Sequence, residues 1–208
     1  MTPDTLDRTL MLPTAPVAPA TVLPDLDDLR RRAVSVLERS ALPTTRDEEW
    51  KYTSLKRLDG IEFGIEAAAV SAEQAEPYAF GEIDQIRIVF VDGSYVPGLG
   101  TPLEGAPGLT VAPFSSGAAA EELGTLVKLD EFVFGAQNTA SMTDGALIRV
   151  SRNTQVDRLV HVMHVTTTHG PRAKLAAPRL LVVAEEGADV RILESYATVG
   201  EGDALVVP

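Results

Sequence analysis

The sequence predicts a mainly β fold with helices near the N-terminus. Short segments rich in Val, Ile and Leu dominate residues 145–208, and each is bounded by Gly, Pro, Asp, Asn or Ser, as is typical of strands. Apolar and polar residues alternate clearly over residues 189–196. The predicted strands are residues 146–150, 159–167, 179–184, 189–194 and 204–207. Because no helix separates them and their spacing is uneven, a sandwich, a barrel and a β-solenoid all fit.

Composition narrows the possible functions. The 208 residues are 45% hydrophobic, so the chain is long enough to bury a real core. A net charge of −12 argues against non-specific binding to nucleic acid or to anionic membranes. The absence of cysteine excludes disulfides, zinc ribbons, Cys-ligated iron–sulfur clusters within the chain and thiol nucleophiles. No signal peptide or membrane span is recognisable, and the cytoplasm is therefore the default location.

The chain divides into four predicted regions. Residues 1–24 are rich in proline and form a predicted disordered leader. Residues 25–80 form a helical region, 81–144 a mixed α/β region, and 145–208 the start of the strand-rich core. The mixed region includes strands over residues 85–91 and 109–112, a hairpin turn at Asp92-Gly93, and helices over residues 118–123 and 130–140.

Two features of the helical region can be predicted in detail. A helix over residues 25–40 turns Leu26, Leu29, Ala33, Val36 and Leu37 inward, and Arg30, Arg31 and Arg32 toward water. Thr45 and Glu48 have capping-box spacing, which predicts a short helix starting at Arg46. We expect Trp50 and Tyr52 to pack that short helix onto the sheet that follows.

The sequence contains no recognisable active site. His161 and His164 are three residues apart on a predicted strand, so they point to opposite faces and cannot share a metal ion without a bulge. A paired-carboxylate site, a Ser-His-Asp arrangement and a Gly-x-Ser-x-Gly motif are also absent. We therefore predict no catalytic, cofactor-binding or metal-ligating residue in this chain.

Four blocks, in order over residues 41–197, resemble the SufB/SufD family of iron–sulfur cluster assembly proteins. They are Leu42-Pro43 with the RDEEWKYT block, RIVFVDGSYVP, FVFGAQNTASMTDGALIRV and AAPRLLVVAEEGADVRILESY. The RDEEWKYT block and the absence of cysteine are more similar to the SufD branch than to SufB. The motif positions, taken as structural, are Arg46, Glu49, Trp50, Tyr52, Asn138, Gly145, Arg179 and Glu194.

The resemblance implies a right-handed parallel β-helix core, incomplete at its C-terminal end. It also implies a non-catalytic scaffold subunit of the SUF complex, with SufB and the SufC ATPase as partners and a role in iron acquisition. The iron–sulfur cluster and ATP would then belong to the complex, with no cofactor bound by this chain alone. Because family members are longer, we expect a truncated chain whose open end can self-associate. The alternatives are a β-helix carbohydrate-active enzyme and a cupin-like small-molecule-binding β-barrel.

Overall fold

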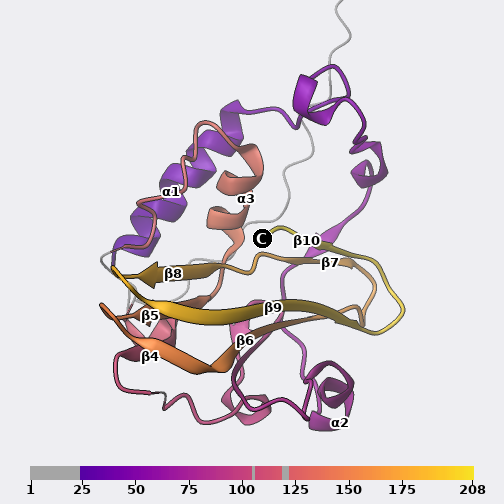
Figure 1. The fold of residues 1–208 in the computed structure, drawn as a ribbon. Helices are drawn as coiled ribbons and strands as arrows, with labels where there is room; N and C mark the ends of the chain where they lie inside the picture. Colours follow the sequence, from indigo (N-terminus) through magenta and orange to yellow (C-terminus); the bar gives the residue numbers. More distant parts are fainter. Residues whose placement is uncertain (1–23, 105, 119–121) are drawn as a thin grey trace, which may run out of the picture.

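The strands form three small sheets, and most of their neighbours are parallel (Figure 1). The computed structural model describes residues 24–104, 106–118 and 122–208, so the predicted leader lies outside this part of the chain except for Pro24. Sheet A has the order β1-β7-β10, sheet B the order β3-β2-β6-β9, and sheet C the order β4-β5-β8. The bounds are β1 Phe63–Gly64, β2 Gln85–Val91, β3 Ser94–Tyr95, β4 Leu109–Pro113, β5 Ala146–Val150, β6 Gln155–Thr167, β7 Ala173–Ala176, β8 Leu180–Ala184, β9 Asp189–Val199 and β10 Ala204–Val206.

The chain passes through sheets C, B and A twice in the same order. Strands β5, β6 and β7 make the first pass, and β8, β9 and β10 make the second. Each strand of the second pass pairs in parallel with its counterpart in the first, as in Ala146↔Leu180 and Lys174↔Ala204. The β6–β9 pairing has one irregularity, between Val156 and Val160. The mainly β prediction is confirmed, while the β-helix itself stays a prediction.

Strands β2, β3 and β4 precede the two passes in sequence and extend sheets B and C, two of them by antiparallel pairing. β2 continues the parallel pairing of sheet B against β6, but β3 turns back antiparallel after Asp92 and Gly93, which both have positive φ. In sheet C, β4 pairs antiparallel with β5 and ends at Pro113, which has no N–H to offer a further strand. The sequence predicted both β2 and the turn correctly.

The space between sheets B and C is filled by aliphatic side chains. Residues of β2, β5 and β6 that point inward, such as Ile86, Ile148 and Val160, are fully buried. Their counterparts on β9, Val190 and Ile192, are only partly buried. The core is therefore dense near β6 and thinner toward β9.

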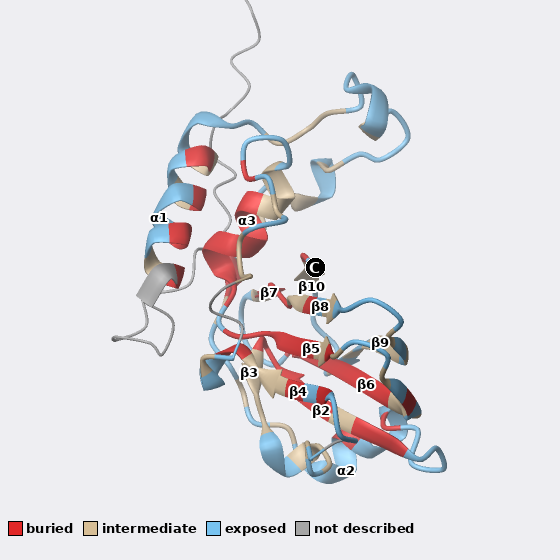
Figure 2. Cartoon of the chain, turned by 60° about the vertical axis from the view of Figure 1, so that its left-hand side comes forward, coloured by how far each residue is buried: buried red, intermediate tan, exposed pale blue. Residues whose placement is uncertain are grey.

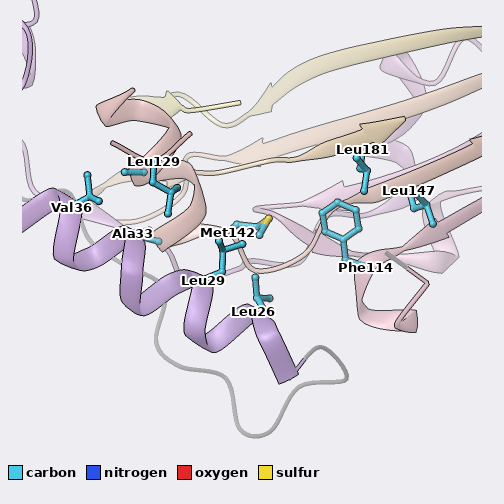
Figure 3. Close-up of a cluster of buried hydrophobic side chains, with 11 residues drawn as sticks. Leu26, Leu29, Ala33, Val36, Phe114, Leu129, Met142, Leu147 and Leu181 are labelled. Atoms are coloured by element: carbon cyan, nitrogen blue, oxygen red, sulfur yellow. The ribbon is translucent and has the colours of Figure 1, made fainter. Parts of the chain in front are cut away.

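Two helices cover the outer face of sheet C. Helices α1 (Pro24–Arg39) and α3 (Val133–Ser141) lie side by side with their buried sides facing each other (Figure 2). Figure 3 shows Leu29 and Ala33 of α1 directed toward Met142, with Leu147 and Leu181 of the sheet beyond. The remaining helical turns are short: α2 Ala72–Ala75, η1 Glu48–Trp50, η2 Lys56–Leu58, η3 Glu76–Tyr78, η4 Pro97–Leu99 and η5 Phe114–Ser116.

Arg30 departs from the sequence prediction. It was expected to face water, but it is only 5% exposed, and its Nη2 donates to the Met142 carbonyl at 2.5 Å. Burial lowers the pKa of Arg30, partly opposed by Asp27 nearby. Arg31 and Arg32 are exposed, as predicted. The error arises because the accepting carbonyl, that of Met142, is 112 residues away in sequence.

The segment after α1 also differs from expectation. Asp47, rather than Thr45 and Glu48, closes the local turn, because its carboxylate accepts from Thr44 N at 2.6 Å. This hydrogen bond is the largest contribution to the lowered pKa of Asp47. The prediction that Tyr52 packs onto the sheet was wrong: its side chain is 92% exposed. Trp50 instead contacts Phe134 of α3, with ring centroids 5.4 Å apart.

Candidate functional site

The eight motif positions fall into two groups. Arg46, Glu49 and Tyr52 are exposed on the segment between α1 and β1, and Trp50 is half-buried there. The other four positions lie in or beside the strand core: Asn138, Gly145, Arg179 and Glu194. The structure brings three of these four together and places Glu194 in a separate cluster.

Asn138 is the centre of the first cluster. Its amide nitrogen donates to the carbonyls of Pro178 and Val207, both at 2.6 Å. Its oxygen accepts from Arg179, whose Nη2 also donates to Thr139 Oγ1 at 2.9 Å. All the hydrogen-bonding capacity of the Asn138 side chain is thus used. The cluster ties α3 to the start of β8 and to the residue after β10.

Gly145 is needed for close packing next to this cluster. A Cβ at position 145 would lie 2.6 Å from the Arg179 carbonyl and 2.5 Å from a ring carbon of Phe114. Both distances are shorter than real contacts allow, and one of the two atoms belongs to the backbone. Any side chain at this position would push β5 away from the residues that lead into β8.

A second cluster surrounds Asp92, at the turn after β2. The Asp92 carboxylate accepts from the backbone N–H of Ala68 and from both the N–H and the hydroxyl of Thr167, at 2.7–3.0 Å. Lys174 of β7 places its ammonium 3.4 Å from the same carboxylate. Both side chains are buried, and each has polar partners, because Lys174 also donates to the Glu66 carbonyl.

His161 forms a third cluster across the three parallel strands of sheet B. Gln85 Nε2 donates to two carbonyls, so its Oε1 must accept from His161 Nδ1–H at 2.8 Å. His161 Nε2 is then the acceptor for the Ser195 hydroxyl, at 2.7 Å. Burial, aided by the positive charge of Arg87, lowers the pKa of His161 to about 4. A histidine with so low a pKa is a weak general base, so this Ser–His–Gln chain is suited to holding strands together rather than to activating a nucleophile.

The fourth cluster lies on the other face of β6 and β9. His164 Nε2 is 3.1 Å from Glu194 Oε1, and the Tyr196 hydroxyl donates to the same carboxylate. The His164 ring stacks between Phe90 and Tyr196, with centroids 5.5 and 5.1 Å away. The hydrogen bond from His164 is the main cause of the lowered pKa of Glu194, and burial followed by the Glu194 carboxylate raises the pKa of Tyr196.

His161 and His164 thus have separate partners on opposite faces of the sheet, as their spacing predicted. Sequence reasoning did not identify Gln85, Asp92, Lys174 or Ser195 as members of buried polar clusters. Their partners lie on other strands, 34 to 76 residues away in sequence for Gln85, Ser195 and Asp92. The register of the sheets brings these residues together. For Asp92, the Asp92-Gly93 dipeptide was a usable signal in the sequence, but it predicts a turn and not a buried ion pair.

The described residues also lack two features that would point to other functions. No group of three or more His, Cys, Asp or Glu side chains there is arranged to hold a metal ion. None of the helices in that part of the chain has the length and apolar character needed to cross a membrane.

Comparison with known proteins places the chain in a family. Residues 17–162 match the family model described as the SufBD protein N-terminal region. The iron–sulfur cluster assembly SufBD family protein slr0076 of Synechocystis sp. is 35% identical over 178 residues, covering 82% of this chain and 39% of that protein. The iron–sulfur cluster assembly protein SufD of Escherichia coli is 30% identical over 166 residues, covering 79% of this chain and 38% of that protein. The chain therefore spans about two fifths of these relatives, and it belongs to the SufBD family.

Proposed function

We propose that this chain is part of a scaffold subunit of a SUF iron–sulfur cluster assembly complex in the cytoplasm, with SufB and the SufC ATPase as partners. The observation that carries the proposal is the family match over residues 17–162, together with relatives whose names state iron–sulfur cluster assembly. The iron–sulfur cluster and ATP act at the level of the complex. The subunit itself has a structural role without catalysis, and it assists iron acquisition.

The proposed scaffold is the start of a right-handed parallel β-helix. Two passes through sheets C, B and A, paired strand by strand in parallel, support this reading. The Asn138–Arg179 cluster supports a structural role, because it fixes α3 to the second pass. Neither a carbohydrate-active enzyme nor a cupin-like barrel is favoured by the family match.

Co-purification tests the proposal. We would express this chain with an affinity tag, alone and extended by the remaining part of the E. coli SufD relative, together with SufB and SufC. We expect the extended form to retain both partners. A tagged β-helix protein of similar net charge from an unrelated family serves as the control for non-specific retention. If the extended form retains neither SufB nor SufC above that control, the proposal is wrong.

The predicted self-association has its own test. If the exposed side of β8, β9 and β10 pairs between copies, light scattering will show a mass that rises with protein concentration. A monomer mass over a wide concentration range would contradict this prediction and leave the scaffold proposal intact.

A further inference from the structure

The described lysines and arginines differ in whether their side chains are paired. Most donate to a carboxylate or to a carbonyl, as Arg158 does to Asp84 and Lys174 to Glu66. Within the described part of the chain, the side chains that form neither an ion pair nor a hydrogen bond are those of Arg32, Arg46, Lys51, Lys56 and Arg57. All but Arg32 lie between α1 and β1. The unpaired positive charge of the described residues is therefore concentrated on one segment.

Three of these cations lie close to an exposed tyrosine. Tyr52 is 92% exposed, and the Lys51 ammonium lies 5.6 Å from the centre of its ring. Lys56 and Arg57 are exposed and follow within five residues, so at most about 18 Å of chain separates Tyr52 from Arg57. Residues 50–58, the basic segment, carry three basic side chains and no acidic one, although the whole chain has a net charge of −12.

The basic segment is held in place at both ends. Trp50 contacts the Phe134 ring of α3, with centroids 5.4 Å apart, and Leu58 packs against the hydrophobic cluster beside β1. A backbone hydrogen bond of 2.9 Å from the Thr53 N–H to the Trp50 carbonyl closes the first turn. In Figure 1 this part of the chain is the purple stretch after α1, which lies apart from the sheets, and Figure 2 shows it as mostly exposed. An ordered backbone that carries exposed side chains loses little entropy on binding.

We propose that the basic segment is a docking surface for a short acidic segment of a partner protein. Carboxylates of the partner pair with Lys51, Lys56 and Arg57, and an apolar side chain beside them covers the Tyr52 ring. Tyrosine and arginine are enriched among the residues that contribute most to the binding energy of protein interfaces. The inference rests on these side chains and not on the proposed scaffold function.

The residues on either side of the basic segment favour a short occupant. Glu48 and Glu49 precede it and Asp59 follows it, and all three side chains are exposed. A nucleic acid or an anionic membrane carries phosphates beyond the length of the segment, so these carboxylates would lie against further negative charge. A short acidic peptide can end before it reaches them. Charge complementarity therefore favours a protein segment over an extended polyanion.

The test measures binding of a short fluorescein-labelled peptide, in which Asp and Glu alternate with Leu, to the purified chain by fluorescence anisotropy. We expect saturable binding that weakens as salt is added. Arg57→Glu and Tyr52→Ala should each raise the Kd about fivefold or more. Arg32→Glu is the matched control, because Arg32 is also exposed and unpaired but lies on α1, and it should change the Kd less than about twofold.

The proposal is overturned if the unchanged chain does not bind the peptide, or if Tyr52→Ala leaves the Kd unchanged. It is also overturned if Arg57→Glu and Arg32→Glu weaken binding equally, because the effect would then be one of net charge. Equal binding of a peptide with Asn and Gln in place of the acidic residues would show that charge is not recognised. Tighter binding of a single-stranded oligonucleotide of the same net charge would replace the protein partner with a nucleic acid. Circular dichroism of each variant establishes that it is folded.

Discussion

Strands β2 and β9 flank β6 on its two sides, and they differ in their burial and in whether their outer edge is covered. β2 is buried along nearly its whole length, and its far edge is occupied: Arg87 N–H donates to Thr101 Oγ1 at 2.8 Å, and Val96 N–H donates to the Val89 carbonyl at 2.9 Å. β9 has no fully buried residue. In sheet B, as described, no strand lies beyond β9.

From this difference we infer that the two strands differ in stability although both pair in parallel with β6. Both strands make parallel hydrogen bonds to β6, but only β2 is covered on its outer edge and on both faces. Burial of apolar surface dominates the stability of a strand, so β2 belongs to the stable core and β9 to a surface that is ready for a neighbour. Four sets of variants test this difference between the strands.

The largest effect is expected from a matched pair of isoleucines. Ile86 of β2 and Ile192 of β9 both pair with Val160, one on each side. Ile86→Ala creates a cavity in a filled core and should lower the free energy of unfolding by about 4 kcal/mol, whereas Ile192→Ala at a partly buried position should cost about half as much. Urea unfolding measures both. Equal losses would contradict the difference between the two strands.

Asn138→Ala tests what holds the second pass in place. The change removes two hydrogen bonds to backbone carbonyls and leaves the partly buried Arg179 guanidinium without its main acceptor. We expect a loss of about 3 kcal/mol in unfolding free energy. Arg32→Ala, on the exposed face of α1, is the control and should change stability by less than about 0.5 kcal/mol. An equally small effect of Asn138→Ala would remove the proposed link between α3 and the second pass.

His161 joins the two flanking strands, and its titration reports whether that link is intact. Its pKa in the folded protein is lowered from 6.5 to about 4, so the unfolded chain binds a proton more readily between these two values. Stability is therefore complete above pH 6.5 and falls as the pH drops toward 4, by up to about 3 kcal/mol. Unfolding titrations of the unchanged chain and of His161→Gln, measured at several pH values, should differ in this window. The same pH dependence in both would show that His161 is not responsible.

The smallest effect is expected outside the strands. Tyr52 is 92% exposed, so Tyr52→Ala should change the unfolding free energy by less than about 0.5 kcal/mol. Trp50→Ala loses the contact with Phe134 and should cost more, on the order of 1–2 kcal/mol. Thermal unfolding of both variants is sufficient. A large loss for Tyr52→Ala would mean that this segment packs as the sequence first predicted.

The comparison also shows what could be predicted from the sequence. β2 and the Asp92-Gly93 turn were predicted closely because the apolar run and the turn residues are local signals. β7, with Lys174 in its short span, was not predicted, because its partners β1 and β10 are distant in sequence. The start of β9 was predicted correctly, but its predicted C-terminal end, residue 194, fell short for a similar reason: residues 195–199 are strand because β6 pairs with them.

The polar clusters were harder to predict than the strands. Arg30 looked like part of a solvated basic run, and its burial depends on a carbonyl at Met142. Glu194 was identified as a motif position, but its contact with His164 follows from the register of β6 and β9. A single sequence predicts the periodicity of each strand and not the register between strands.

Hydrogen–deuterium exchange of the backbone amides in β2, β6 and β9 measures directly whether β9 is less protected than β2 and β6. We predict that β2 and β6 exchange at rates set by global unfolding, and that the amides of β9 on the edge away from β6 exchange much faster. Equal protection of β9 and β6 in the monomeric chain would contradict this inference, because β9 would then need a covering neighbour, and among the described residues sheet B has no strand beyond β9.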